Sequence, residues 1–156
     1  MIGPFVHAGV QVGALLYSAD ATPYGPLVRL AAITGARQGE LLRARWGDID
    51  WQTTTLSIRG TKTEGSFRRI DLGDLGIALL KEHHASELEK RLKLGPGVTC
   101  GNPDATVFTN VVGRPMDAVG LKRTWKRIIK NAGVGHFRFH DLRHAVATIF
   151  WLLARR

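Results

Sequence analysis

The stretch TGARQGELLRARWGDID, residues 34–50, lies where the chain changes from one type of secondary structure to another. On its C-terminal side, Leu56 and Ile58 alternate with polar residues, as do Ile70 and Leu72. Strict alternation is typical of a half-buried β-strand, whereas apolar residues at intervals of three and four, as before this stretch, are typical of an amphipathic helix. The sequence therefore predicts an α+β fold that is mainly helical and contains a small antiparallel β-sheet.

Three helices are predicted up to the end of this stretch. The first covers residues 10–19, and Thr22 followed by Pro23 supplies an N-cap and a first-turn proline for the second. The second helix is expected to end near Gly35, because glycine is the usual residue in the left-handed position after a helix. The third helix is short and runs over residues 38–45.

Beyond this stretch, GTKTEGS, residues 60–66, joins the two alternating segments, which predicts a β-hairpin with Lys62 at its tip. A long helix is predicted over about residues 75–92. Two ion pairs at i,i+4 spacing are predicted on it: Glu87 with Arg91, and Glu89 with Lys93. The Gly- and Pro-rich residues 95–104 should form a loop, and VFTN, residues 107–110, a short strand.

Two helices are predicted in the C-terminal part of the chain. The helix over residues 117–131 is amphipathic, and one of its faces is apolar: Leu121, Trp125, Ile128 and Ile129. The opposite face is basic: Lys122, Arg123, Lys126, Arg127 and Lys130. A basic face is typical of a nucleic-acid contact and equally of an ordinary solvated surface. The last helix begins near residues 138–140, and its apolar run, residues 145–154, is predicted to be buried.

The 156 residues include 22 Lys and Arg against 13 Asp and Glu, which gives a formal net charge of +9. This excess favours a polyanionic partner, above all nucleic acid. A membrane partner is not expected, because the longest apolar run is about half of the ~20 residues needed to cross a bilayer. The start MIGPFVHAGV lacks the features of a secretory signal, so a cytoplasmic protein is expected. Cys100 is the only cysteine and should be an ordinary loop thiol.

His140, Arg143 and His144 project from one side of the last predicted helix. Their HxxxH spacing is that of two zinc ligands in metalloproteases, but Asp141 stands where the catalytic glutamate would be, and Arg143 would bring a positive charge to the ion. Arginine with histidine suits a phosphate better, because guanidinium binds two oxygens and imidazole transfers a proton near neutral pH. A third interpretation is that His140 or His144 satisfies a buried backbone group. We predict no metal or cofactor site.

Arg37 enters the sequence where the third predicted helix starts, and the free N–H groups of a helix start attract anions. Glu40 follows one turn later and could orient this arginine. Taken alone, Arg37 is better explained as a solvated surface charge. The other motifs of the chain decide between these interpretations.

Four stretches together resemble, in order and spacing, the catalytic domain of the tyrosine recombinase or phage integrase family. They are residues 34–50, IRGTKTEGSFRRIDL at 58–72, FTN at 108–110 followed by GRPM, and FRFHDLRHAVAT at 137–148. The resemblance runs from about Val12 to the last residue. It implies an integrase-like, mainly helical DNA breaking and rejoining domain with a small antiparallel sheet. Double-stranded DNA and other recombinase protomers are the implied partners, in DNA recombination and DNA integration.

By this resemblance Arg37 is the first catalytic arginine, Lys62 the hairpin lysine, and His140 and Arg143 the histidine and second arginine of HxxR. The arginines would bind the phosphate oxygens, Lys62 would be the general acid, and His140 would assist proton transfer, without a metal or cofactor. Two supporting residues are implied: Glu40 beside the first arginine, and His144 in a structural role. The basic face of the helix over residues 117–131 would contact DNA.

The nucleophile of the family is a tyrosine that follows HxxR, whereas the tyrosines of this sequence, Tyr17 and Tyr24, precede Arg37. We therefore expect an N-terminal tail, residues 1–9, and a catalytic domain, residues 10–156, that is incomplete at its C-terminal end through truncation, gene decay or fragmentation. Such a domain should bind DNA without cleaving it by itself. Its last helix should expose apolar side chains that later elements would cover.

Two other functions are compatible with the sequence. One is a non-catalytic DNA-binding module that regulates a full-length recombinase by occupying its site. The other is a zinc hydrolase built on His140 and His144. The zinc hydrolase is the weaker alternative, because it leaves Arg37 and Lys62 without a role.

Overall fold

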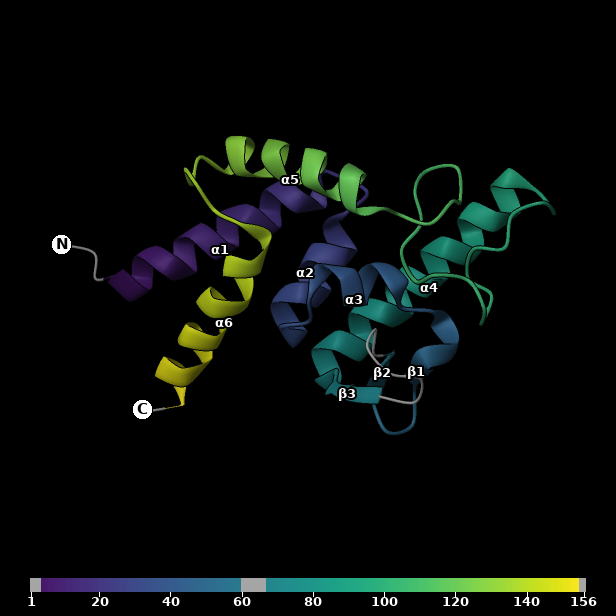
Figure 1. Ribbon diagram of the computed structural model, residues 1–156, viewed down its shortest axis with the longest axis horizontal. Helices are drawn as coiled ribbons and strands as arrows, with labels where there is room; N and C mark the ends of the chain where they lie inside the picture. Colours follow the sequence, from purple (N-terminus) through teal and green to yellow (C-terminus); the bar gives the residue numbers. More distant parts are fainter. Residues whose placement is uncertain (1–3, 60–66, 155–156) are drawn as a thin grey trace. The chain divides into compact units, whose positions relative to one another are not determined.

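The computed structural model describes residues 4–59 and 67–154, and the chain divides into two compact units. One unit combines Met1–Gln38 with Ala118–Arg156, so both ends of the chain belong to it, and the other is Gly39–Asp117. Figure 1 shows the elements in chain order. The predicted α+β class is confirmed, because helices dominate and the strands form a small antiparallel sheet.

The first unit is helical, with α1 (Pro4–Asp20), α2 (Gly25–Thr34), α5 (Ala118–Ala132) and α6 (Phe139–Leu153). α1 packs against the other three helices, and α2 also packs against α6. Apolar side chains from all four helices make the core: Val12, Leu15, Leu27, Leu30, Leu121, Trp125, Ile128 and Leu142. Ser18 is buried among them, and its hydroxyl donates to the Ile128 carbonyl at 3.1 Å, so this polar group is satisfied. α1 begins at Pro4 rather than at residue 10, because proline is well tolerated in a first turn.

The connection between α1 and α2 differs from the prediction. Thr22 does not cap α2; its hydroxyl donates to a carbonyl at the end of α1 at 2.8 Å and accepts from the Tyr24 N–H at 3.2 Å. These bonds make a turn, so α2 begins later, at Gly25, and Pro26 rather than Pro23 is the proline of its first turn. Threonine suits a helix cap and a turn equally well, and here the turn is formed.

The prediction that the apolar run of α6 is buried is wrong. Its described side chains, from Ala145 to Ile149 with Trp151 and Ala154, are all half-buried or exposed, and Trp151 is 53% exposed. α6 packs against α1 and α2, and these contacts leave part of its apolar surface in solvent. The helix itself is confirmed.

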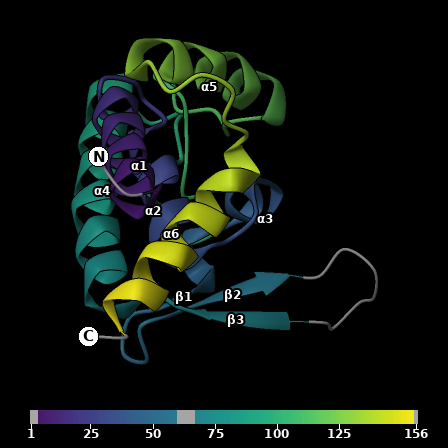
Figure 2. The same ribbon diagram turned by 90° about the vertical axis from the view of Figure 1, so that its left-hand side faces the viewer.

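The second unit contains α3 (Gln38–Arg43), a 3₁₀ turn η1 (Trp46–Asp48), β1 (Ile49–Asp50), β2 (Thr55–Arg59), β3 (Phe67–Asp71) and α4 (Gly73–Leu94). The strands are antiparallel in the order β1-β2-β3, and Figure 2 shows β2 and β3 side by side. Leu56 pairs with Ile70, so the alternating apolar residues share the buried face. The predicted strand pairing is confirmed, whereas Lys62 lies outside the described residues.

Several boundaries in this unit differ from the prediction. α3 ends at Arg43, two residues earlier than predicted, and β1 is not predicted at all. Leu72 is predicted in a strand but precedes α4, and its N–H donates to the Thr54 carbonyl at 2.9 Å. The predicted strand VFTN is wrong, because Thr109 forms only an isolated bridge with Pro115. The long helix is confirmed as α4, slightly extended at both ends.

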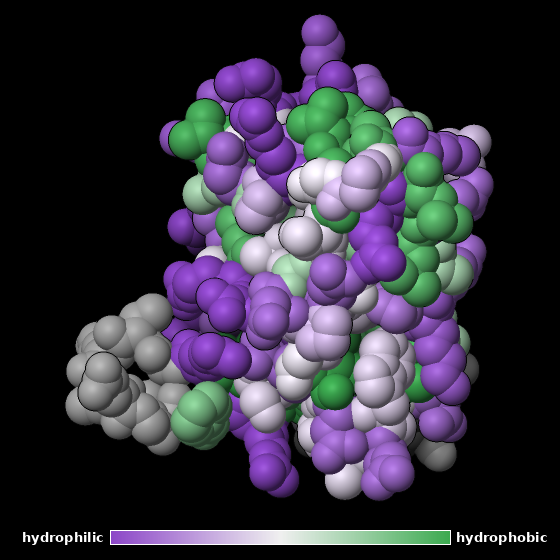
Figure 3. Space-filling model, turned by 90° about the vertical axis from the view of Figure 1, so that its right-hand side faces the viewer, coloured by the Kyte–Doolittle hydropathy of each residue, from purple (hydrophilic) through white to green (hydrophobic). Residues whose placement is uncertain are grey.

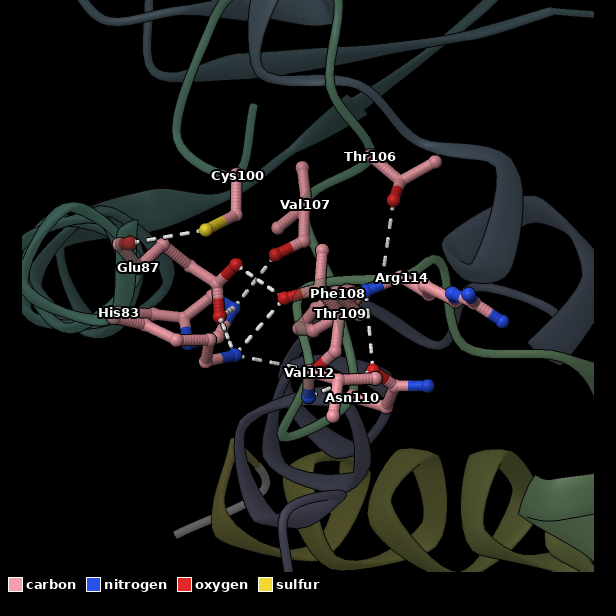
Figure 4. A network of polar contacts seen from close by, with 11 residues as sticks. His83, Glu87, Cys100, Thr106, Val107, Phe108, Thr109, Asn110, Val112 and Arg114 are labelled. Atoms are coloured by element: carbon pink, nitrogen blue, oxygen red, sulfur yellow. Dashed lines mark hydrogen bonds and ion pairs between the residues drawn. The ribbon is translucent and has the colours of Figure 1, made fainter. Parts of the chain in front are cut away.

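A buried carboxylate connects α4 to the segment that follows it (Figure 4). Glu87 is 1% exposed; its Oε1 accepts a hydrogen bond from Lys90 Nζ at 2.6 Å, and its Oε2 accepts one from Thr109 Oγ1 at 2.5 Å. The predicted pairing of Glu87 with Arg91 is therefore wrong. The carboxylate reaches the later segment instead of the helix surface, and Arg91 donates to Asn102.

Two further side chains extend this network. His83 Nε2 lies 2.7 Å from the Val107 carbonyl oxygen and 3.9 Å from Glu87 Oε1. The Cys100 thiol donates to the Glu87 backbone carbonyl at 3.3 Å. The thiol is buried instead of lying at the surface of its loop, and this burial raises its pKa. These contacts hold residues 100–109 against α4.

The face drawn in Figure 3 is largely hydrophilic and carries its apolar residues in separate small groups. Several apolar side chains of the second unit are exposed: Leu75, Leu92, Leu94, Val111 and Val112. Scattered apolar residues of this kind are normal on a protein surface and do not by themselves indicate an interface. In the part of the chain that the structure describes, none of the helices combines the length and the apolar character needed to cross a membrane.

We predict that stability decreases in mild acid because of His83. Burial is the main cause that lowers its pKa from the ordinary value of 6.5; Lys90 and His84 lower it further, and the Val107 carbonyl and Glu87 oppose the shift. The unfolded chain then binds a proton that the folded chain does not. The free energy of unfolding should therefore fall as the pH is lowered through the ordinary value of about 6.5 and below it, as urea denaturation would measure. His83→Gln keeps an N–H donor but cannot titrate, so it should flatten this dependence; an unaltered dependence would contradict the assignment.

Candidate functional site

The residues after α2 carry Arg37 out of the helix. Gly35 is left-handed, with φ of 67° and ψ of 16°, and its N–H donates to the Ala31 carbonyl at 2.8 Å, as expected for the residue that ends a helix. The Thr34 hydroxyl donates to a carbonyl of α2 and accepts from the Ala36 N–H at 3.2 Å. The turn is thus fixed on both sides of the glycine, and Arg37 follows it directly.

The start of α6 is fixed by a second set of bonds. Asp141 Oδ2 accepts from the Arg138 backbone N–H at 2.9 Å, and Oδ1 accepts from Arg138 Nη2 at 3.1 Å. These hydrogen bonds lower the pKa of Asp141, and the bond from the Arg138 guanidinium contributes most to this shift. Trp125 Nε1 donates to the Phe137 carbonyl at 2.9 Å, which attaches the preceding residues to α5. His140 therefore lies in a well-defined first turn.

Arg37, His140 and Arg143 line one pocket of the first unit, with a volume of about 170 Å³. Its other lining residues are mostly apolar: Ala31, Ala36, Gln38, Phe139 and Leu142. Two guanidinium groups offer forked N–H donors to the oxygens of one anion, and the imidazole can accept or give a proton. The pocket thus brings together three of the four predicted catalytic residues. The fourth, Lys62, lies outside the described residues.

The ring of His140 contacts the ring of His144. Their Nε2 atoms are 3.3 Å apart in an edge-to-face arrangement, so one nitrogen donates and the other accepts. His140 and His144 are both exposed, which makes the interpretation that either satisfies a buried backbone group wrong. A zinc site built on His140 and His144 would need a third ligand. Within residues 4–59 and 67–154, no three His, Cys, Asp or Glu side chains lie where they could hold a metal ion.

Glu40, predicted to support Arg37, has a partner in the second unit that the sequence analysis missed. Its Oε2 accepts a hydrogen bond from Arg68 Nη2 at 2.6 Å, and its side chain is only 11% exposed. Arg68 pairs with Ile58 across the sheet, so it lies on the same face of β3 as the buried Ile70, although its own side chain is 48% exposed. A cation on the apolar face of a strand is unusual, and this alternation was the signal that could have indicated an ion pair. Support of Arg37 by Glu40 stays a prediction.

The basic face predicted on α5 is present. Leu121, Trp125 and Ile128 are buried, and the cations on the other side are all exposed: Lys122, Arg123, Lys126, Arg127 and Lys130. The amphipathic pattern is therefore confirmed. Contact of these cations with DNA stays a prediction.

Comparisons with known proteins agree with one another. Residues 11–152 match the sequence model of the phage integrase family. The chain is 35% identical over 144 residues to a tyrosine recombinase XerC-like protein of Caldanaerobacter subterraneus subsp. tengcongensis, a match that covers 78% of this chain and 37% of that protein. It is 28% identical over 132 residues to the integrase of Salmonella phage P22, covering 84% of this chain and 32% of that protein. The chain thus spans about a third of the length of these relatives.

Solved structures of recombinases share the fold. The site-specific recombinase XerH bound to difH substrate, in a pre-cleavage complex, matches with a TM-score of 0.66 at 25% identity, over 93% of this chain and 42% of that chain. The XerA recombinase matches with a TM-score of 0.69 at 22% identity, over 88% of this chain and 47% of that chain. Both are larger proteins in which a fold like that of the present chain forms one part.

Gly35→Ala should destabilise the fold and place a methyl group in contact with Arg143. A Cβ at this position is strained by the left-handed backbone and would lie 3.4 Å from Arg143 Cγ. We expect a loss of about 1–2 kcal/mol in the free energy of unfolding and a change in the Nε–Hε chemical shift of Arg143. Gly133→Ala is the matched control, because Gly133 has the same φ of 67° and a Cβ there would meet nothing within 4 Å. Equal effects of both variants on Arg143 would contradict the packing argument.

Proposed function

Because the chain belongs to the phage integrase family, we propose that it is the catalytic part of a tyrosine site-specific recombinase, acting on double-stranded DNA in DNA recombination and DNA integration. Its proposed task is to bind the duplex and to activate one phosphodiester. The net charge of +9 supports a polyanionic substrate.

The observation that carries this proposal is the pocket shared by Arg37, His140 and Arg143. Two arginines and a histidine in one cavity match what cleavage of a phosphodiester requires, because its non-bridging oxygens carry the negative charge, the attacking hydroxyl loses a proton and the leaving oxygen gains one. Arg37 and His140 are exposed and Arg143 is half-buried, so a phosphodiester can reach all three side chains from solvent.

The proposed reaction is a transesterification at phosphorus. A hydroxyl attacks the scissile phosphate, the bond to the leaving 5′ oxygen breaks, and that oxygen takes up a proton. Arg37 and Arg143 would bind the non-bridging oxygens and stabilise the charge of the transition state, so the mechanism does not call for a metal ion. Lys62 would protonate the leaving oxygen, and His140 would assist removal of the proton from the attacking hydroxyl.

The attacking hydroxyl is not assigned to a tyrosine of this sequence. Tyr17 is 82% exposed on α1, Tyr24 precedes α2, and neither is among the described residues that line the pocket. We infer that the tyrosine of the family reaches the pocket from outside residues 1–156, in the same protein or in another recombinase protomer. Other protomers are therefore proposed as partners beside DNA.

The exposed basic face of α5 supports a second candidate function, a non-catalytic DNA-binding regulator of a full-length recombinase. A protein that binds DNA through this face would occupy a recombination site without using the pocket. The two candidates differ in one measurable respect: the pocket arginines contribute to DNA affinity in the first and not in the second.

The 156-residue chain alone should bind a nicked suicide duplex without forming a covalent adduct, because no hydroxyl nucleophile is assigned to its pocket. Mobility shift would detect the binding, and denaturing gel electrophoresis would detect an adduct. An adduct mapped to Tyr17 or Tyr24 would show that the chain carries its own nucleophile. Failure of the chain to bind any duplex would overturn the proposed function itself.

Arg37→Ala combined with Arg143→Ala should weaken DNA binding and reduce the slope of log K against log salt concentration by about 1, as expected when one phosphate contact is lost. Fluorescence anisotropy at several salt concentrations measures both. Lys81→Ala with Lys93→Ala is the matched control, since it removes the same charge from exposed positions of α4. The regulator is favoured instead if the pocket variant keeps the full slope while Lys126→Ala with Arg127→Ala reduces it.

A further inference from the structure

A second pocket lies in the second unit, between α3 and β2, with a volume of about 250 Å³. Its charged lining residues are three arginines and two carboxylates: Arg43, Arg45, Arg59, Glu40 and Asp48. The proposed reaction gives none of these arginines a role. Their surplus over the carboxylates indicates a site for an anion.

Both carboxylates of this pocket are already engaged by other groups. Asp48 Oδ1 accepts from Arg59 Nη2 at 3.0 Å, and its Oδ2 accepts from the Arg45 backbone N–H at 3.0 Å. Glu40 accepts from Arg68, as described above. The two carboxylates are 8% and 11% exposed, whereas their arginine partners are 61% and 48% exposed, so solvent screens these ion pairs in part. They neutralise Arg59 and Arg68 and leave two guanidinium groups of the pocket uncompensated.

These two are Arg43 and Arg45. Both are exposed, and within residues 4–59 and 67–154 neither forms an ion pair. Ser57 lines the same pocket, and its hydroxyl can donate a hydrogen bond, whereas the hydroxyl of Thr106 already donates to the Phe108 carbonyl. Two guanidinium groups and one hydroxyl together supply the several donors that an anion with several oxygens, such as a phosphate, requires.

The position of these arginines in the sequence indicates a polymeric anion. The chain from Arg37 to Arg43 can span at most about 20 Å, since an extended chain covers about 3.5 Å per residue. Duplex DNA carries one phosphate per about 1.7 Å of its axis. A duplex that places one phosphate at Arg37 therefore has other phosphates at separations that Arg43 can match.

We propose that Arg43 and Arg45 bind a second backbone phosphate of duplex DNA, different from the phosphate held by Arg37 and Arg143. This inference rests on the proposed DNA-binding function and adds to it a contact made by the second unit. A phosphate contact carries no sequence information, so its role is to hold the duplex in register at the candidate site.

The test is the double variant Arg43→Ala with Arg45→Ala, measured by fluorescence anisotropy with duplex DNA over a range of salt concentrations. Its affinity should fall, and its salt slope should be smaller than that of the unsubstituted chain by about 1. The control Lys81→Ala with Lys93→Ala loses the same charge at exposed positions of the same unit and should keep the slope. Arg43→Lys with Arg45→Lys should keep most of the slope, because it retains the charge, but bind more weakly, because it lacks the forked donors. Thermal denaturation checks that each variant is folded.

Three outcomes would overturn the inference. An equal fall of the slope in the control would assign the effect to net charge alone. If the double variant keeps the slope while the unsubstituted chain binds DNA normally, the contact of Arg43 and Arg45 with a phosphate is contradicted and the proposed function is not. If the unsubstituted chain does not bind DNA, both the contact and the proposed function are contradicted. Unchanged DNA binding with weaker binding to polyglutamate would assign the pocket to an acidic protein segment.

Discussion

The backbone at Gly35 has to be left-handed for the chain to leave α2 and bring Arg37 into the pocket that α6 also lines. A residue with a Cβ would be strained in this conformation, and its Cβ would lie in van der Waals contact with the aliphatic part of Arg143. The glycine that ends the helix is therefore also a neighbour of the second arginine. One backbone conformation thus determines where Arg37 leaves the helix and what Arg143 packs against.

In the second unit the corresponding constraint is a buried charge. The exposed pair Glu89–Lys93, predicted and confirmed at 2.9 Å, is of a kind that contributes about 0.3–0.5 kcal/mol. Removing one partner of a buried pair typically costs about 3–5 kcal/mol, because the other charge is left without compensation, and the pair of Glu87 with Lys90 has its carboxylate buried. That pair helps to hold residues 100–109, which include Thr106 of the second pocket. The network around Glu87 therefore stabilises a segment that lines the second pocket, although Glu87 itself does not line it.

Periodicity was sufficient to predict α4, α5 and the pairing of β2 with β3, because their apolar residues recur at fixed intervals. It could not predict the burial of Glu87, since a segment from later in the sequence covers it, and local spacing favours a surface pair with Arg91. Spacing also placed His140 and Arg143 on one helix face. No local pattern encodes the meeting of Arg37 with them, because it depends on how α2 packs against α6; the family resemblance supplied that expectation.

Phosphate contacts raise affinity for every duplex, since the backbone is the same at every sequence. The candidate pocket, the pocket of the second unit and the face of α5 would all act in this way, so none of them distinguishes a recombination site from other DNA. Selectivity then requires base contacts or DNA shape in addition. A domain that bound phosphates without selectivity and held its own nucleophile would cleave DNA at many sequences. In the proposed function the attacking hydroxyl comes from outside the pocket, so binding and cleavage would be separate events and the second could depend on the correct assembly.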